Sequence, residues 1–229
     1  WQLALCGLFY NLGIWIDKFL FWWLDPAAEK IGGLLHSAPV YDRVVYFAFL
    51  TIVPGMAVFL LKLETDFAVA NDHFFQHVLK KGTLAQVTER KQAMITALQD
   101  GFGLLLKVQG LFTIVLILGA EKILPIIGLG AVQAGIFQIA LIGTFLLVVF
   151  MSLLMVLHYL DKRRDAMVAC AVFAGTNLLV TWGSIVAGER WFGIGFLVAA
   201  GLGTVLAGFW VNQHVRNLEY DTFTPQPLY

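Results

Sequence analysis

The stretch that decides the fold runs from residue 134 to residue 157 and reads AGIFQIALIGTFLLVVFMSLLMVL. It is almost continuously apolar and lacks the alternation of apolar and polar residues that marks a half-buried strand. A helix needs about 20 apolar residues, rising about 1.5 Å each, to cross a hydrocarbon core of about 30 Å. The stretch therefore predicts a membrane-spanning helix.

Five further stretches have a similar length and hydropathy. The six predicted spans are residues 3–24, 44–63, 103–120, 134–157, 166–187 and 191–211. Helices are favoured over strands because backbone N–H and C=O groups in lipid need partners within their own segment. We therefore expect an all-α, polytopic membrane protein with six transmembrane helices.

The composition supports this fold class. Of the 229 residues, 59% are hydrophobic and 13% are charged, whereas soluble domains average about 45–50% apolar and about 25% charged residues. Lys plus Arg and Asp plus Glu each number 15, so the chain has no basic excess with which to bind nucleic acid. The composition thus predicts a surface in contact with membrane lipid.

The first residue, Trp1, already lies within a hydrophobic run. That run is too long for a signal peptide and lacks a basic n-region. We therefore expect the sequence to be a fragment whose N-terminal part is missing.

Basic residues predict how the helices are oriented. Most of them gather on one side when residues 64–102, the turn at 158–165 and the tail at 212–229 are placed together. The positive-inside rule assigns that side to the cytoplasm, so we expect both termini to be cytoplasmic. The loops predicted to face outwards are 25–43, 121–133 and 188–190.

Residues 64–102 interrupt the membrane pattern with charge and read as two amphipathic helices. Their apolar stripes are Phe74, Phe75, Val78 and Leu79 in the first helix and Val87, Met94, Ile95 and Leu98 in the second. Gly82 separates the helices, and Thr83 with Gln86 has the form of a capping box. We expect a cytoplasmic helical hairpin, or a helix pair on the membrane surface. The predicted organisation is residues 1–63 with the outer loop 25–43, the insertion 64–102, spans three to six over 103–211, and the tail 212–229.

Asp17 and Lys18 lie well inside the first span, where a charge costs at least about 2.5–3.5 kcal/mol and normally faces a bundle interior or an aqueous cavity. The side chains that share one face of this helix are Asn11, Trp15, Lys18 and Trp22, and Asp17 lies on the neighbouring face. A polar stripe rich in aromatic rings suits a path for a sugar or a lipid-linked sugar. The alternative is that Lys18 snorkels outwards and Asp17 neutralises it.

Pro54 and Gly55 lie midway through the second span. Proline removes a backbone donor and clashes with the preceding turn, so we expect a kink there. Such kinks serve as hinges in secondary transporters, although a static kink set by packing is an equal alternative. Elsewhere in the spans, Asn177 and the glycines of the last span predict helix–helix contacts.

Motifs for catalysis are missing from the sequence. It has no Gly-rich phosphate loop, nucleophile elbow or acidic metal-binding cluster. His73 and His77 have i, i+4 spacing, but no third ligand is evident, so a solvated helix face is the simpler interpretation. Cys6 and Cys170 lie in apolar segments and are expected to be buried thiols. We therefore expect no enzyme, no cofactor and no metal.

Two stretches resemble a known family. Residues 10–22 read YNLGIWIDKFLFW, and residues 39–67 read PVYDRVVYFAFLTIVPGMAVFLLKLETDF. They resemble PelG, the membrane transporter of the Pel exopolysaccharide system, in the polysaccharide-flippase superfamily that also holds the MATE exporters. The charged stretch that follows Phe67, through Gly82 and Thr83 to Met94, is similar to that family's cytoplasmic insertion. The positions that carry the resemblance are Asn11, Asp17, Lys18, Tyr41, Asp42, Glu64, Thr65, Asp66 and Phe67.

The resemblance implies about twelve spanning helices in two six-helix halves, with this chain as the C-terminal half. It further implies export of an amino-sugar polymer, rich in N-acetylgalactosamine and galactosamine, across a bacterial inner membrane for the biofilm matrix. The partners it implies are the cytoplasmic glycosyltransferase and the cyclic-di-GMP-sensing membrane components of the same machine. Six helices alone give the cavity one wall, so this fragment by itself is not expected to transport.

Two alternatives remain open beside transport of this polymer. One is a membrane scaffold in which residues 64–102 dock a cytoplasmic glycosyltransferase. The other is a flippase for a different lipid-linked saccharide. A six-helix membrane enzyme is disfavoured because the sequence shows no convergent acid–base or metal cluster.

Overall fold

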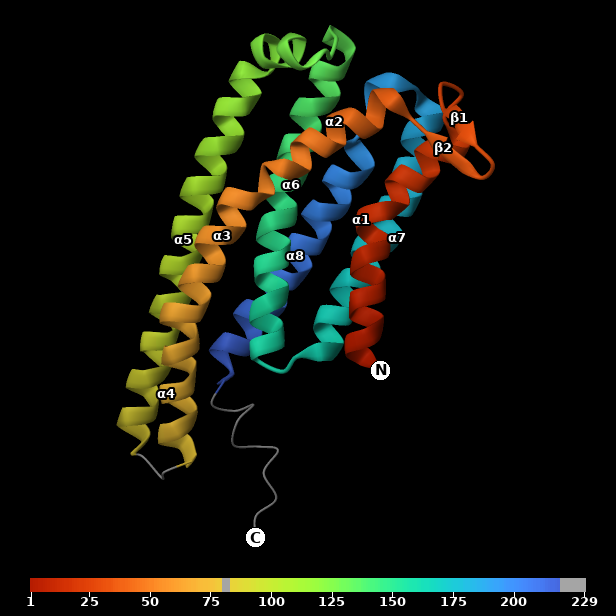
Figure 1. Ribbon diagram of the computed structural model, residues 1–229. Helices are drawn as coiled ribbons and strands as arrows, with labels where there is room; N and C mark the ends of the chain where they lie inside the picture. The colour runs from red at the N-terminus through yellow and green to blue at the C-terminus, as the bar shows by residue number, and fades with distance from the viewer. Residues whose placement is uncertain (80–82, 219–229) are drawn as a thin grey trace. The chain divides into compact units, whose positions relative to one another are not determined.

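The computed structural model describes residues 1–79 and 83–218 of the chain, and helices dominate it (Figure 1). The helices are α1 (Gln2–Leu24), α2 (Pro39–Leu50), α3 (Ile52–Lys62), α4 (Ala68–Leu79), α5 (Leu84–Ile123), α6 (Ala131–Tyr159), α7 (Arg163–Ala187) and α8 (Ile194–Arg216). Shorter elements are the strands β1 (Glu29–Gly32) and β2 (Leu35–Ser37), a π-helical turn at Leu63–Phe67, and 3-10 turns at Leu124–Ile127 and Glu189–Trp191.

Within the described residues, six helical stretches are long and apolar enough to cross a membrane. They are Gln2–Leu24, Pro39–Val78, Ala85–Ile126, Gln133–Tyr159, Arg163–Ala187 and Glu189–Arg216. Each contains one predicted span, although Pro39–Val78 and Ala85–Ile126 extend well beyond theirs. The prediction of an all-α, multi-pass membrane protein is confirmed.

The chain forms two compact units. The first contains residues 1–51 and the chain from Thr113 onwards, and the second contains residues 52–112. Helix α5 contributes to both, because it begins in the second unit and its last turns belong to the first.

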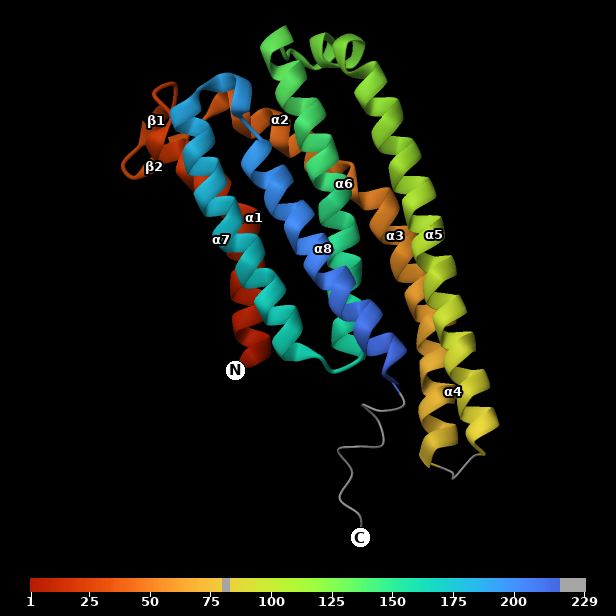
Figure 2. The ribbon, with the colours of Figure 1, turned by 180° about the vertical axis from the view of Figure 1, so that it is seen from behind.

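The first unit is a bundle in which α7 packs against α1 and α8, and α6 packs against α8 and α2. Figures 1 and 2 show α8 between α6 and α7. Trp1, the turn between α6 and α7 and the end of α8 lie at one end of this unit, whereas the β1–β2 hairpin lies at the other (Figure 2). The basic turn Lys162-Arg163-Arg164 is therefore at the same end as Trp1.

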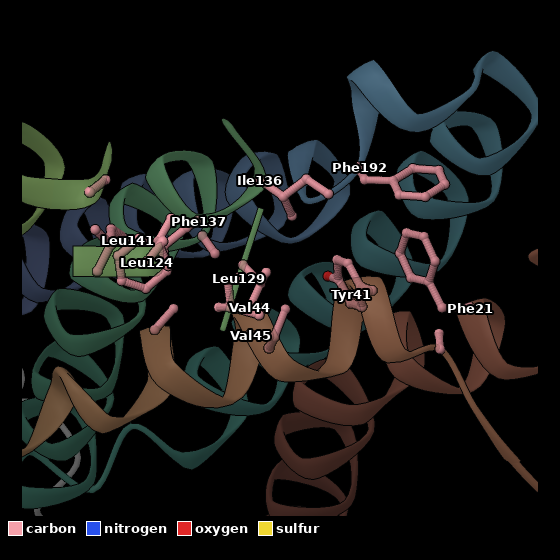
Figure 3. Packing of buried hydrophobic residues seen from close by; sticks show 14 residues of the cluster. Phe21, Tyr41, Val44, Val45, Leu124, Leu129, Ile136, Phe137, Leu141 and Phe192 are labelled. Carbon is pink, nitrogen blue, oxygen red and sulfur yellow. The ribbon is translucent and has the colours of Figure 1, made fainter. Parts of the chain in front are cut away.

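A hydrophobic cluster fixes the start of α2 against α1 (Figure 3). The rings of Phe21 and Tyr41 stack with their centroids 3.8 Å apart, and Phe192 meets Phe21 edge to face at 4.6 Å. The labelled members of the cluster are Phe21, Tyr41, Val44, Val45, Leu124, Leu129, Ile136, Phe137, Leu141 and Phe192. Its residues come from α1, α2, α6, the end of α5 and the connections around them, so several spans share one core.

The loop predicted at 25–43 contains a short antiparallel hairpin, β1–β2, in which Glu29 pairs with Ser37 and Gly32 with Leu35. Gly33 has a φ of 56°, a left-handed conformation that glycine adopts without a steric penalty. Gly33 and Leu34 form the two-residue loop, and a glycine at the first loop position is typical of a hairpin turn.

The second predicted span is interrupted at Thr51, between α2 and α3. Pro54 has no N–H to bond to the carbonyl of Leu50, and its ring disfavours continuation of the preceding turn. At the interruption itself, the Thr51 hydroxyl donates to the carbonyl of Ala48 at 2.6 Å. A helix break therefore lies one turn before Pro54-Gly55, whereas a hinge at these residues stays a prediction.

In the second unit, α5 runs beside α3 and α4. The rings of Phe59 and Phe102 lie 5.2 Å apart, and a side chain on Gly55 would collide with Gln109. Farther along, Phe74 and Met94 are fully buried. Among the members of the two predicted stripes, Phe74, Val87, Met94 and Leu98 are buried, whereas Phe75, Val78 and Ile95 are half-buried.

Thr83 begins α5 with the predicted capping box. The Thr83 N–H donates to Gln86 Oε1 at 3.0 Å, and the Gln86 N–H donates to Thr83 Oγ1 at 3.4 Å. This prediction is confirmed, whereas the predicted break at Gly82 lies outside the described residues. From Leu84, α5 continues without interruption through residues 102 and 103 to Ile123, so the edge of the membrane along this helix stays a prediction.

Candidate functional site

The candidate site is built around a carboxylate buried in the first unit. Asp17 of α1 is 0% exposed. Burying a charged carboxylate costs several kcal/mol unless partners compensate it. Asp17 has two such partners, because the Tyr41 hydroxyl donates to its Oδ2 at 2.7 Å and the Lys18 ammonium lies 3.1 Å from its Oδ1. The pair of ionisable side chains is thus satisfied within the protein.

The Lys18 ammonium is held by α1, α2 and α8. It donates to the carbonyl of Ile14 at 2.7 Å and lies 4.7 Å from the ring centroid of Phe49 and 5.7 Å from that of Phe196. Cation–π contacts with two rings stabilise the charge, and the side chain is 12% exposed. The alternative in which Lys18 snorkels outwards does not fit this geometry.

A second pair of contacts joins the same two helices. The Trp22 Nε1–H donates to Asp42 Oδ1 at 3.1 Å and to Oδ2 at 2.9 Å. Asp42 also accepts from the Ser37 hydroxyl at 3.2 Å and from the Ala38 N–H at 2.9 Å. A carboxylate in the first turn of α2 is favourable because it faces the positive end of the helix dipole.

A pocket of about 370 Å³ opens between α1 and α2. Its lining residues are Ile14, Trp15, Lys18 and Trp22 from α1, and Asp42, Val45, Tyr46 and Phe49 from α2. Ligand pockets typically enclose about 300–1,000 Å³ and combine apolar walls with a few polar groups. Four of the eight lining residues are aromatic, and the charged residues Lys18 and Asp42 contribute little to a pocket surface that is almost entirely apolar. Such a pocket can stack a sugar ring on its aromatic faces.

The structure brings most of the predicted path residues together. Trp15, Lys18 and Trp22 line the pocket, while Asp17 lies behind it and holds Lys18. Asn11 does not join them, because its side-chain amide donates to the carbonyl of Gly7 on its own helix at 2.8 Å and is exposed.

The contribution of α2 was missed. Asp42, Tyr46 and Phe49 share one face of α2, since they are spaced i, i+4 and i+7. This spacing was readable from the sequence, but which neighbour the face meets was not.

The other motif residues belong to the second unit, where they make local contacts. Lys62 Nζ lies 2.7 Å from Asp66 Oδ2, and the Thr65 hydroxyl donates to the carbonyl of Leu61 at 2.9 Å. Phe67 is buried and Glu64 is exposed. These residues shape the π-helical turn at Leu63–Phe67 and do not line the pocket between α1 and α2.

Within residues 1–79 and 83–218, no group of three or more His, Cys, Asp or Glu side chains is placed to hold a metal ion. His77 Nδ1 lies 2.8 Å from the carbonyl oxygen of His73, one turn earlier on the same helix.

Comparison with known protein families gives a match over most of the chain. A family model described as "PelG: Putative exopolysaccharide Exporter (EPS-E)" matches residues 1–223. No curated protein and no solved structure matches the chain. The matched range covers nearly the whole chain and includes every residue that lines the pocket.

Proposed function

Because the chain belongs to the PelG family of exopolysaccharide exporters, we propose that it helps move an exopolysaccharide across the membrane, with the pocket between α1 and α2 on the path of the polymer. Family membership supports transport rather than catalysis. The pocket supports a sugar ligand through its aromatic walls, and its residues come from both stretches in which the family resemblance was seen.

The observation that carries the proposal is the buried Asp17–Lys18 pair next to this pocket. Replacing a buried ion pair by apolar residues of similar volume is often neutral or stabilising. Stability alone therefore does not explain why the chain has an ion pair inside a membrane-spanning helix. Ionisable residues within a membrane commonly mark the path of a substrate or an ion. Lys18 connects the pair to the pocket because it contacts Asp17 and also lines the wall.

The aromatic walls suit a polymer that has to move. Stacking of a sugar ring on an aromatic face depends little on the exact position of the ring. Trp15 and Tyr46 are 47% and 62% exposed, so each presents a ring to a ligand without a large rearrangement. A path of this kind holds each sugar unit weakly and releases it to the next position.

We extend the proposal to a Pel-like amino-sugar polymer of the biofilm matrix, with a glycosyltransferase and cyclic-di-GMP-sensing membrane components as partners. The resemblance to the MATE-like flippase superfamily supports a twelve-helix exporter in which these six helices form one half. The shared position of Trp1, the Lys162-Arg163-Arg164 turn and the end of α8 supports an orientation in the inner membrane with that end in the cytoplasm.

A secretion assay tests the path. In the exporter that contains this chain, Trp15→Ala is expected to lower polymer secretion about two- to tenfold, because an aromatic contact contributes about 0.5–1.5 kcal/mol. Trp23→Ala is the matched control, since Trp23 is 60% exposed on the same helix and is not among the lining residues.

The double variant Asp17→Ala with Lys18→Ala removes the ion pair and is expected to lower secretion further. Unchanged secretion by both this variant and Trp15→Ala, at normal protein levels in the membrane, would contradict the proposed path. If the protein is instead a docking scaffold, Trp15→Ala should leave secretion unchanged, whereas deletion of residues 68–98 should lower it.

A further inference from the structure

Two thiols from distant parts of the sequence meet inside the first unit, away from the pocket between α1 and α2. The sulfur atoms of Cys6 on α1 and Cys170 on α7 lie 3.5 Å apart. Both are free cysteines, and they are 3% and 0% exposed. His158 of α6 is the third member of the cluster, with its Nε2 3.9 Å from Cys6 Sγ.

A second pocket, of about 340 Å³, reaches this cluster from the surface of the first unit. Cys6 and Tyr10 of α1 and Met151, Met155 and His158 of α6 are among its lining residues. A small neutral molecule in the pocket would therefore meet the Cys6 sulfur and the His158 ring together. Cys170 is not among the lining residues and lies on the inner side of Cys6.

We propose that Cys6 and Cys170 form an oxidisable dithiol, which a hydroperoxide converts into a disulfide that ties α1 to α7 and slows export. The chemical part stands on the thiol pair and its pocket. The effect on export rests on the proposed function.

The reaction takes place in two steps. His158 Nε2 accepts the proton of the Cys6 thiol, and the resulting thiolate attacks the terminal oxygen of the hydroperoxide. The O–O bond breaks, Cys6 becomes a sulfenic acid, and the released alkoxide takes the proton to leave as an alcohol, or as water when the oxidant is hydrogen peroxide. The Cys170 sulfur then attacks the Cys6 sulfur, so that a disulfide forms and water leaves.

The placement of the thiols explains why the second step follows the first. The two sulfurs are already in van der Waals contact. Formation of the disulfide therefore requires only that the two side chains move closer together. Helices α1 and α7 are held together along their length, for example where the Asn177 amide donates to the carbonyl of Gly13 at 2.8 Å. The sulfenic acid on Cys6 therefore finds Cys170 before any thiol from another chain reaches this buried site.

The proposed orientation places these thiols near the cytoplasmic end of the bundle, where thiols are normally kept reduced. The pair would then be reduced at rest, and its disulfide would form during oxidative stress. Helix α1 also carries Trp15, Lys18 and Trp22, so a covalent link from α1 to α7 restrains the helix that supplies half of the pocket wall.

The test treats membranes that contain the whole exporter with increasing hydrogen peroxide, blocks the remaining thiols with N-ethylmaleimide and maps the peptides by mass spectrometry. The expected product is a peptide pair joined through Cys6 and Cys170, which dithiothreitol separates. With Cys170→Ser, dimedone is expected to trap a sulfenic acid on Cys6 instead. With His158→Gln, disulfide formation is expected to slow on the order of tenfold or more.

The matched control combines Cys6→Ala with Leu5→Cys, which keeps two thiols in the chain but turns one to another face of α1. No joined peptide is expected from it. Failure of the native pair to join under conditions that oxidise a small-molecule dithiol would overturn the chemical part.

Export is measured in the same preparations. Peroxide is expected to reduce polymer export at least several-fold, with recovery on adding dithiothreitol and no response in Cys6→Ser. If the Cys6–Cys170 disulfide formed and export stayed unchanged, the proposal that the disulfide slows export would be wrong. If no polymer were exported even by the unaltered protein without peroxide, the proposed function would be wrong. The mass-spectrometric result would still show whether Cys6 and Cys170 form a disulfide.

Discussion

At the scale of single residues, the Asp17 carboxylate and the Lys18 ammonium depend on each other. Asp17 is buried and Lys18 is largely buried, and each loses its main charged partner if the other is removed. Breaking a buried ion pair from one side costs about 3–5 kcal/mol because an uncompensated charge remains, whereas removing both charges together costs far less. The stability of the protein therefore reports on this pair independently of transport.

We expect Lys18→Met to lower the free energy of unfolding by about 3–5 kcal/mol. Combining it with Asp17→Leu should recover a large part of that loss. Thermal or denaturant unfolding in detergent measures the difference. If Lys18→Met alone were as stable as the unaltered protein, the ammonium would have to lie in water, contrary to the contacts with Phe49 and Phe196.

At the scale of elements, the packing of α1 against α7 depends on a glycine. A methyl group on Gly13 would collide with the ring of Phe173 and lie 3.3 Å from the Cα atom of Ala174. Small residues at such contacts let two membrane helices approach closely. The Asn177 amide donates to the Gly13 carbonyl at the same place, so the two helices are both in close contact and hydrogen-bonded at this short segment.

Gly13→Ala is expected to destabilise the first unit by about 1–3 kcal/mol, the usual effect of overpacking a tight contact. Gly7→Ala is the matched control on the same helix, because its added methyl group would meet no atom of a neighbouring helix within 4 Å. The melting temperatures of both variants in detergent give the comparison. Equal melting temperatures would show that α1 and α7 are not in close contact at Gly13.

At the scale of the whole molecule, the first unit predicts a topology that labelling can test. Leu34, at the tip of the β1–β2 hairpin, is 82% exposed, and the Arg163 side chain, in the basic turn at the other end of the unit, is 57% exposed. The positive-inside rule places the basic turn in the cytoplasm. The hairpin should then face the periplasm.

In a background where Cys6 and Cys170 are replaced by serine, Leu34→Cys is expected to react with a membrane-impermeant maleimide in intact spheroplasts. Arg163→Cys is expected to react only after the membrane is permeabilised. Gel-shift labelling measures both reactions. The reverse labelling pattern would show that the protein has the opposite orientation in the membrane, with the thiol pair near the periplasmic end.

Much of this protein could be derived from its sequence because the relevant forces act locally. The apolar runs specify helices wherever lipid is the solvent, and Thr83 with Gln86 specifies the start of α5 by hydrogen bonds within one turn. The burial of Asp17 also follows from local position, since a charge in mid-span has to avoid lipid. The β1–β2 hairpin was not predicted, although Gly33, the first residue of its loop, is a local signal too.

What only the tertiary structure decided is which helix faces meet. Tyr41 reaches Asp17, Asp42 reaches Trp22, and Cys170 lies against Cys6 because of how α1, α2 and α7 pack, and no spacing along the chain specifies these pairs. Lipid is as apolar as a leucine side chain, so hydrophobicity places a helix in the membrane without selecting its neighbour. That selection depends on close packing and on a few polar contacts, which appear only when all the helices are in place.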